Sequence, residues 1–174
     1  GATATHRAGA AGSLLSGGVT PPDGTTVLLV RHGQPERRGR DGVLTALGSQ
    51  QAAATARAIG LQRRDVLVSS TRRRAVQTAT ALGRVPVEVA GLDEFRSAQG
   101  GPEEERFGFA APGLLHRGDA EESLPQFQER VRAALATLLD PPPAARLVVV
   151  VHSGVVDALL RWARGTDSAD LWTC

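Results

Sequence analysis

Short apolar runs alternate along this chain with longer segments whose apolar positions recur at helical spacing. Val27 to Val30 form a run that is apolar throughout, which is typical of a strand buried on both faces inside a parallel sheet. The run Leu147 to Val151 has the same character. Shorter strands are predicted at Asp65 to Val68 and near Val85 to Val89.

Helices are predicted between these strands. The segment 44–60 has an apolar face, with Thr45 as a plausible N-cap and Gly60 as the C-terminal stop. Further helices are expected in "TRRRAVQTATALG", which closes at Gly83, from Leu124 to Leu139 before three prolines, and after the last strand. The alternation predicts an α/β fold, a three-layer sandwich with a mainly parallel central sheet.

The length of 174 residues fits one domain. Residues 1–24 are rich in Gly, Ala, Ser and Thr and are predicted to be a flexible arm, so residues 25–174 form the single domain. The segment Asp93 to Ala120 lacks a sustained period and carries many Gly, Pro and charged residues. This segment is a candidate substrate-facing loop.

Charge and composition exclude several classes of partner. The net charge is only +2, and the arginine clusters have no aromatic residues interleaved with them, so a nucleic-acid surface is not expected. No apolar segment approaches the length of a membrane span. The single cysteine, Cys174, excludes an internal disulfide framework and a cysteine-based metal site, and favours the cytoplasm.

Two histidines follow the two buried strands. His32 comes after Val30 and Arg31, and His152 comes directly after Val151. If the strands are parallel neighbours, both side chains emerge at the carboxyl edge of the sheet, where open α/β sheets bind ligands. Either histidine alone would be assigned to the core. As a pair at equivalent strand ends, together with nearby arginines, they favour a pocket for an anionic group such as a phosphoryl group.

Five stretches extend this interpretation to a known family. "LLVRHGQ", "LTALGSQQA", "SSTRRRAVQTA", "LDE" and "VVVHSG" occur in this order between Val27 and about Trp162. In this order they resemble the histidine phosphatase superfamily, also called phosphoglycerate mutase-like. The resemblance implies a phosphoglycerate mutase-like fold and a reaction that needs neither a metal nor an organic cofactor.

The resemblance also implies roles for five residues. His32 would be the nucleophile that becomes phosphohistidine, and Arg31 and Arg74 would bind the phosphate. His152 would bind phosphate and stabilise the transferred group. Glu94 stands at the position of the family's acid, which protonates the leaving oxygen and then activates water.

Several neighbouring residues have alternative interpretations. Asp93 or one of Glu103, Glu104 and Glu105 could be the acid in place of Glu94. Arg72 and Arg73 are expected to form a solvated helix face, and Ser70 is expected near the crevice. Thr71 stands where many members of the family have proline. His6 and His116 are not expected to take part.

These features predict a cofactor-independent phosphatase acting on a phosphomonoester, either a phosphorylated small molecule or a phosphoprotein. The short interval between Glu94 and His152 leaves no room for an extensive cap, which favours a phosphatase over a mutase. Two alternatives remain: a repurposed enzyme of the same fold, and a catalytically silent module that binds phosphorylated ligands.

Overall fold

The computed structural model describes residues 3–6, 25–36, 41–95, 122–143 and 146–165. Its centre is a five-stranded sheet with the order β1-β2-β5-β3-β4. The strands are β1 (Thr3–His6), β2 (Thr26–Arg31), β3 (Val66–Ser69), β4 (Val87–Glu88) and β5 (Arg146–Val151). Strands β2, β5, β3 and β4 pair in parallel, and β1 pairs with β2 in antiparallel orientation. The predicted parallel sheet is therefore confirmed.

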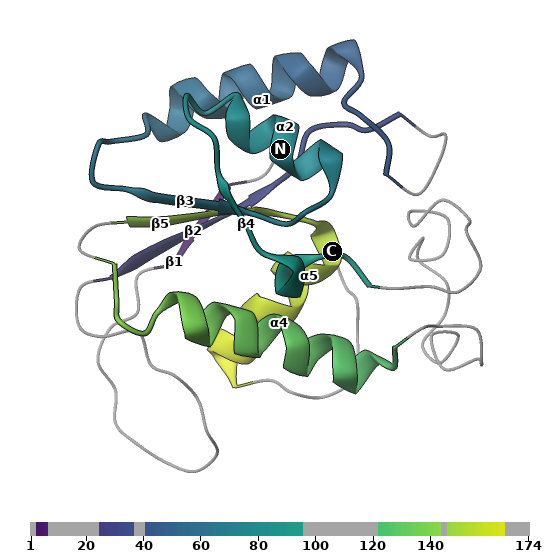
Figure 1. The fold of residues 1–174 in the computed structure, drawn as a ribbon, viewed down its shortest axis with the longest axis vertical. Coiled ribbons are helices and arrows are strands. Elements are labelled where there is room, and N and C mark those ends of the chain that lie inside the picture. Colours follow the sequence, from purple (N-terminus) through teal and green to yellow (C-terminus); the bar gives the residue numbers. More distant parts are fainter. Residues whose placement is uncertain (1–2, 7–24, 37–40, 96–121, 144–145, 166–174) are drawn as a thin grey trace.

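Within the described ranges, four α-helices cover the two faces of the sheet (Figure 1). Helices α1 (Ala46–Ile59) and α2 (Arg73–Thr80) lie on one face, and α4 (Leu124–Leu138) and α5 (Ser153–Arg164) lie on the other. A short 3₁₀ helix, η1 (Ala90–Leu92), follows β4. This three-layer arrangement agrees with the fold class predicted from the alternating pattern.

Side-chain alternation along the central strands builds a separate core on each face. Leu28, Val30, Val148 and Val150 point toward α1 and α2, where they pack with residues such as Ala75. Their neighbours along the strands point to the opposite face and pack against α4 and α5; these are Leu29, Leu147, Val149 and Val151. Because successive strand residues face opposite sides, a run that is apolar throughout is what a doubly covered strand requires.

Predicted helix limits agree with the structure at most ends. Helix α1 begins after Thr45, whose Oγ1 accepts a hydrogen bond from the Gly48 amide, and it ends before Gly60. Helix α2 stops at Thr80, two residues before the predicted end ahead of Gly83, because the chain then tightens into i→i−3 hydrogen bonds that reach Gly83. Helix ends commonly shift by one or two residues, so the end of α4 at Leu138 matches the prediction.

The two edges of the sheet differ from the expectation. Residues 3–6 lie within the segment predicted to be a flexible arm, yet they form β1 along the open edge of β2. Pairing with that edge satisfies backbone groups of β2. The remainder of this segment, 7–24, lies outside the described residues. At the other edge β4 has only two residues, and Pro86, which cannot donate to a strand partner, directly precedes it.

Among the described residues, no helix has the length and apolar content needed to cross a membrane.

Candidate active site

The two histidines predicted to meet do lie together at the carboxyl edge of the sheet. Strands β2 and β5 are parallel neighbours in which Arg31 is opposite Val151, and the His32 amide donates to the Val151 carbonyl over 2.9 Å. The rings of His32 and His152 have centroids 5.0 Å apart and an interplanar angle of 64°. His32 is 8% exposed and His152 is completely buried. The strand register therefore dictates the pairing of the two rings.

Hydrogen bonds set the orientation and tautomer of the His32 ring. Nδ1 lies 2.7 Å from the carbonyl oxygen of Gly33, which can only accept, so Nδ1 carries the proton. Nε2 then presents its lone pair, and Arg74 Nε donates to it over 3.1 Å. A neutral imidazole whose unprotonated nitrogen faces an arginine is suited to nucleophilic attack on an anionic group.

Position 33 requires a glycine because α1 approaches it closely. A Cβ at this position would lie 2.4 Å from the carbonyl oxygen of Gly48, which is shorter than any tolerated contact. The amide of Gly33 donates to Oγ1 of Thr78 over 3.0 Å, and this hydroxyl donates to the Arg74 carbonyl over 2.7 Å. The glycine thus allows the loop to pack on both helices with its carbonyl directed at His32.

The arginines near the two rings differ in burial. Arg74 lies in α2 and is only 6% exposed, whereas Arg31 ends β2 in an exposed position. Arg73 is exposed and its amide donates to Asp41 over 2.6 Å, which fits the predicted solvated face. Arg72 does not fit that prediction. Its side chain is 23% exposed, and its Nε lies 3.9 Å from Oδ2 of Asp93.

His152 is held from the side of β3. Its Nε2 lies 2.7 Å from the hydroxyl of Ser70, and this hydroxyl also accepts from the Arg72 amide over 3.3 Å. The hydroxyl can donate to Nε2 or accept from it, so this contact fixes the orientation of the His152 ring and is compatible with either tautomer. Nδ1 is buried and has no hydrogen-bond partner among the described residues.

Glu94 lies beside the start of α5. It is 4% exposed, and its two carboxylate oxygens accept from the amides of Phe95, over 3.0 Å, and Gly154, over 3.2 Å. A Cβ at position 154 would lie 2.4 Å from Oε1 of Glu94, so any larger residue there would displace this carboxylate. Gly154 is two residues after His152. The hydrogen bond from its amide therefore links the candidate acid to the segment that carries the second histidine.

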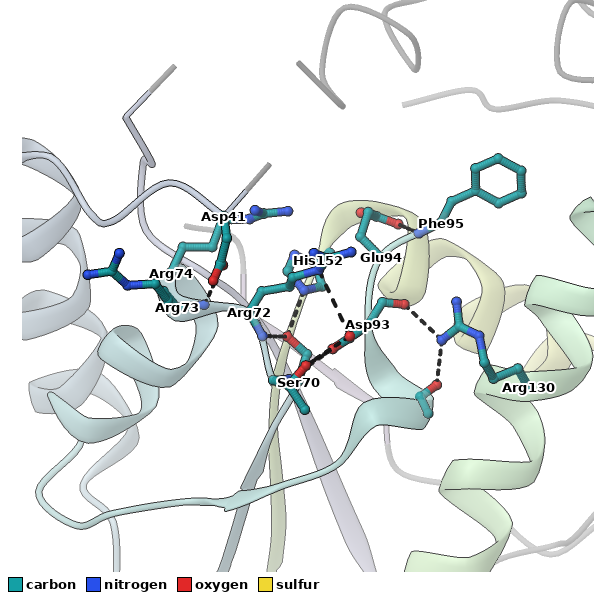
Figure 2. A network of polar contacts seen from close by, with 12 residues as sticks. Asp41, Ser70, Arg72, Arg73, Arg74, Asp93, Glu94, Phe95, Arg130 and His152 are labelled. Carbon is teal, nitrogen blue, oxygen red and sulfur yellow. Dashed lines mark hydrogen bonds and ion pairs between the residues drawn. The ribbon is translucent and has the colours of Figure 1, made fainter. Parts of the chain in front are cut away.

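The other candidate acids have different placements. The Asp93 carboxylate accepts hydrogen bonds from Thr71 and does not share the contacts of Glu94, as Figure 2 shows. Glu103, Glu104 and Glu105, like His116, lie outside the described residues. Arg130 of α4, which no sequence signal identified, donates to the carbonyls of Gly91 and Asp93 over 2.9 and 3.0 Å.

Burial and positive charge act on both rings in the same direction. The pKa of His32 is lowered to about 4, chiefly by burial; the bond to Gly33 opposes this shift, and the charges of Arg74 and Arg31 add to it. The pKa of His152 is also lowered well below its usual value by burial, by His32 and by the nearby arginines. Both rings are therefore neutral near pH 7.

In the described part of the chain, no group of three His, Cys, Asp or Glu side chains could hold a metal ion.

Comparisons with known proteins agree with this site and fold. The sequence model of the histidine phosphatase superfamily (branch 1) matches residues 27–174. The chain belongs to this superfamily, as its five motifs predicted. The uncharacterized phosphatase PhoE of Bacillus subtilis (strain 168) is 28% identical over 156 residues, which cover 82% of this chain and 79% of PhoE.

Two solved structures illustrate the similarity of fold. Bacillus stearothermophilus YhfR has a TM-score of 0.73 and 26% identity, covering 86% of this chain and 85% of its own. A phosphoglycerate mutase from Thermus thermophilus has a TM-score of 0.60 and 35% identity, covering 78% of this chain and 82% of its own. The superfamily and its phosphatase-named members support a phosphatase-type activity for this chain.

Proposed function

We propose that this protein is a cofactor-independent phosphatase that hydrolyses a phosphomonoester through a phosphohistidine intermediate on His32. The observation that carries the proposal is the His32 ring, whose Nδ1 proton is held by Gly33 while Nε2 faces Arg74. A neutral ring with a fixed tautomer can attack phosphorus without first losing a proton. Its low pKa keeps it in this form near pH 7.

In the first step, Nε2 of His32 forms a bond to phosphorus while the ester P–O bond breaks. Glu94 gives its proton to the leaving alcohol oxygen, so that the alcohol departs neutral. Before the attack, Arg74 must exchange its hydrogen bond to Nε2 for one to a phosphoryl oxygen, because Nε2 needs its lone pair to bond to phosphorus. Arg31, Arg74 and His152 stabilise the charge on the equatorial oxygens.

In the second step, a water molecule attacks phosphorus on the side that the alcohol has left. Glu94, now a carboxylate, takes a proton from this water as the P–N bond breaks. Inorganic phosphate departs and His32 returns to its starting tautomer. In the tautomer that carries the ring proton on Nδ1, His152 can donate from this buried nitrogen, which has no partner among the described residues, to a phosphoryl oxygen in both steps.

A phosphorylated small molecule is the substrate class that the comparisons favour over a phosphoprotein. One solved relative, a mycobacterial glucosyl-3-phosphoglycerate phosphatase, is 25% identical with a TM-score of 0.62, covering 78% of this chain and 82% of its own. The substrate in that name is a phosphorylated small molecule. The cytoplasm stays the predicted location because the lone cysteine favours a reducing compartment.

The test is hydrolysis of p-nitrophenyl phosphate in the presence of a chelator, by the wild type and by His32→Ala, with trapping of acid-labile phosphate on the protein. We expect turnover and a trapped phosphohistidine in the wild type, and a loss of at least about 1,000-fold in kcat for the variant. Wild-type protein that binds orthovanadate but releases no product would instead identify a silent binding module.

The arginines supply a matched control within one helix. Arg74→Ala should weaken orthovanadate binding and lower kcat, because Arg74 is buried beside His32. Arg73→Ala removes an equal charge from the adjacent, exposed position and should leave both nearly unchanged. Equal losses in the two variants would show that general positive charge, and not contact with the phosphoryl group, is responsible.

A further inference from the structure

The carboxylate of Asp93 is directed at the loop that follows β3. Oδ1 accepts from the amide and from the hydroxyl of Thr71, each over 2.9 Å, and Oδ2 accepts from the same hydroxyl over 2.8 Å. Arg72 Nε adds a weaker attraction at 3.9 Å. Asp93 is only 7% exposed. A buried carboxylate that accepts from one residue through three contacts fixes the position of that residue.

Thr71 lies between two parts of the phosphate side of the site. Ser70, just before it, contacts Nε2 of His152, and Arg72, just after it, is the N-cap of α2. Helix α2 in turn carries Arg74, which contacts His32. Any displacement of Thr71 would therefore move the group that orients His152 and the start of the helix that bears Arg74.

The main chain of Asp93 is held from the opposite side. Arg130 donates from Nη1 to the Asp93 carbonyl over 3.0 Å and to the Gly91 carbonyl over 2.9 Å. The remaining nitrogens of the guanidinium donate to both carboxylate oxygens of Glu122, over 2.9 and 2.5 Å. The residue that follows Asp93 is Glu94. Figure 2 shows Asp93 between Arg130 and the loop at Ser70, with Glu94 next along the chain.

We propose that Asp93 is a positioning residue that couples the two halves of the site. Its side chain locks the loop that orients His152, and its main chain, held by Arg130, locks the segment that presents Glu94. The inference rests on the proposed function. It also assigns Asp93 a role different from that of the acid, because a carboxylate whose two oxygens accept from the amide and the hydroxyl of Thr71 is directed away from a leaving group.

The demands of the reaction explain why such coupling matters. Phosphoryl transfer requires the nucleophile, the oxygen-binding groups and the proton donor to be in place together, and a displacement of about 1 Å can cost about 100-fold in rate. Thr71 contributes two donors, its amide and its hydroxyl. A proline at this position would have neither, so this link to Asp93 depends on the threonine of this chain.

Four variants test the proposal: Asp93→Ala, Asp93→Asn, Thr71→Val and the double variant Asp93→Ala/Thr71→Val. Each is assayed for kcat on p-nitrophenyl phosphate and on glycerol 3-phosphate, for orthovanadate binding and for thermal unfolding. Asp157→Ala is the control for Asp93, because Asp157 pairs with Arg161 on α5 over 2.6 Å. Thr80→Val is the control for Thr71, because Thr80 is exposed and its hydroxyl donates to the Val76 carbonyl within α2.

We expect Asp93→Ala to lower kcat about 10- to 100-fold on both substrates and to weaken orthovanadate binding, at temperatures where the variant is fully folded. Thr71→Val should produce a loss in the same direction, and the double variant should be no worse than Asp93→Ala alone. Asp93→Asn should recover part of the loss, since its amide oxygen can still accept from Thr71. The two control variants should behave as wild type.

Three outcomes would overturn the proposal. If Asp93 were the acid, Asn would be as damaging as Ala, the loss would be confined to glycerol 3-phosphate, and Thr71→Val would have no effect. If Asp93 only stabilised the fold, the melting temperature would fall while kcat and orthovanadate binding stayed unchanged. If the losses of kcat in Asp93→Ala and Thr71→Val were additive in the double variant, the two residues would not be coupled. A wild type without turnover would refute the proposed function, and orthovanadate binding would then still decide the coupling.

Discussion

Arg74 Nε donates a hydrogen bond to Nε2 of His32 over 3.1 Å. The arginine that is proposed to bind phosphate therefore contacts the lone pair of the proposed nucleophile. The same arginine lowers the pKa of His32, together with burial, which is the larger cause, and with Arg31. The contact thus adds to the effect of burial that keeps the ring neutral, and it keeps Nε2 directed at the place where an anionic group would bind. A substrate phosphoryl group can accept the hydrogen bond from the guanidinium in place of His32, which frees the lone pair of Nε2.

The first prediction concerns the titration of His32 in the folded protein. NMR of the ring protons should give a pKa of about 4, against the ordinary value of 6.5. Arg74→Gln should move this pKa upward, because it removes a nearby positive charge that disfavours protonation. Arg73→Gln, at the exposed neighbour, should leave it in place. A His32 that titrates near 6.5 in the wild type would contradict the burial and charge that the site imposes.

The same pKa shift predicts how stability depends on pH. The unfolded chain takes up a proton at His32 near pH 6.5 and the folded chain only near pH 4, so the unfolded state binds more protons between these values. The free energy of unfolding should therefore fall by roughly 2–3 kcal/mol between pH 7 and pH 4.5 on account of His32. His152 acts in the same direction.

Urea unfolding of the wild type and of His32→Asn at both pH values measures this contribution. The asparagine cannot take up a proton, so the variant should lose less stability than the wild type on acidification. Parallel losses in the two proteins would mean that His32 is as easily protonated in the folded state as in the unfolded state.

The pairing of the two histidines could be predicted from the sequence because it depends on strand register alone. Once two strands that are apolar on both faces are parallel neighbours, the histidines that follow Arg31 and Val151 must meet at one edge. The four α-helices were visible for a similar local reason, namely periodicity and caps such as Thr45. These features reside in contiguous stretches of sequence.

Contacts between distant segments could not be predicted in this way. Arg130 contacts Asp93 only because α4 packs beside η1, and nothing in the pattern of α4 distinguishes Arg130 from the more exposed side chain of Arg132 two residues later. The link between Thr71 and Asp93 likewise joins two loops. Strand β1 was missed because four residues of alternating small and polar type have no pattern of their own and gain one only from the edge of β2.

The third prediction concerns Gly154, which lies against Glu94. Gly154→Ala places a methyl group where Oε1 of Glu94 now lies, so the carboxylate must move. We expect kcat on glycerol 3-phosphate to fall about tenfold or more, with a smaller loss on p-nitrophenyl phosphate, because an aryl leaving group needs little protonation. Orthovanadate binding should persist. Ser153→Ala, at the exposed neighbour, is the control.

A direct test of the acid accompanies this variant. Glu94→Gln keeps the shape of the side chain but cannot transfer a proton, so it should show the same preference for the aryl substrate as Gly154→Ala, with a larger loss. Equal losses on the two substrates in either variant would refute the role of Glu94 as proton donor, because the leaving group would then not affect the result.

The last prediction concerns the N-terminal ends of the strands, opposite the carboxyl ends that carry the candidate site. It separates effects on stability from effects on catalysis. Asp65 has a completely buried side chain and forms an ion pair with Arg146 over 2.5 Å, at the N-terminal ends of β3 and β5. Arg146 also donates to the carbonyls of Ile59 and Gly60 at the end of α1. Burial alone would raise the pKa of Asp65, but the hydrogen bonds and charge of Arg146 and the amide of Gln62 hold it below its ordinary value.

Asp65→Asn should therefore lower the free energy of unfolding by about 1–3 kcal/mol at pH 7, measured in urea, because Arg146 loses its charged partner. The difference from the wild type should shrink as the pH falls below about 4, because the unfolded chain then binds a proton at Asp65 that the folded chain, with its lowered pKa, does not yet bind. Turnover of p-nitrophenyl phosphate by the folded variant should be unchanged, since the pair lies at the edge opposite His32. A loss of kcat without a loss of stability would mean that the two edges of the sheet are coupled through the strands.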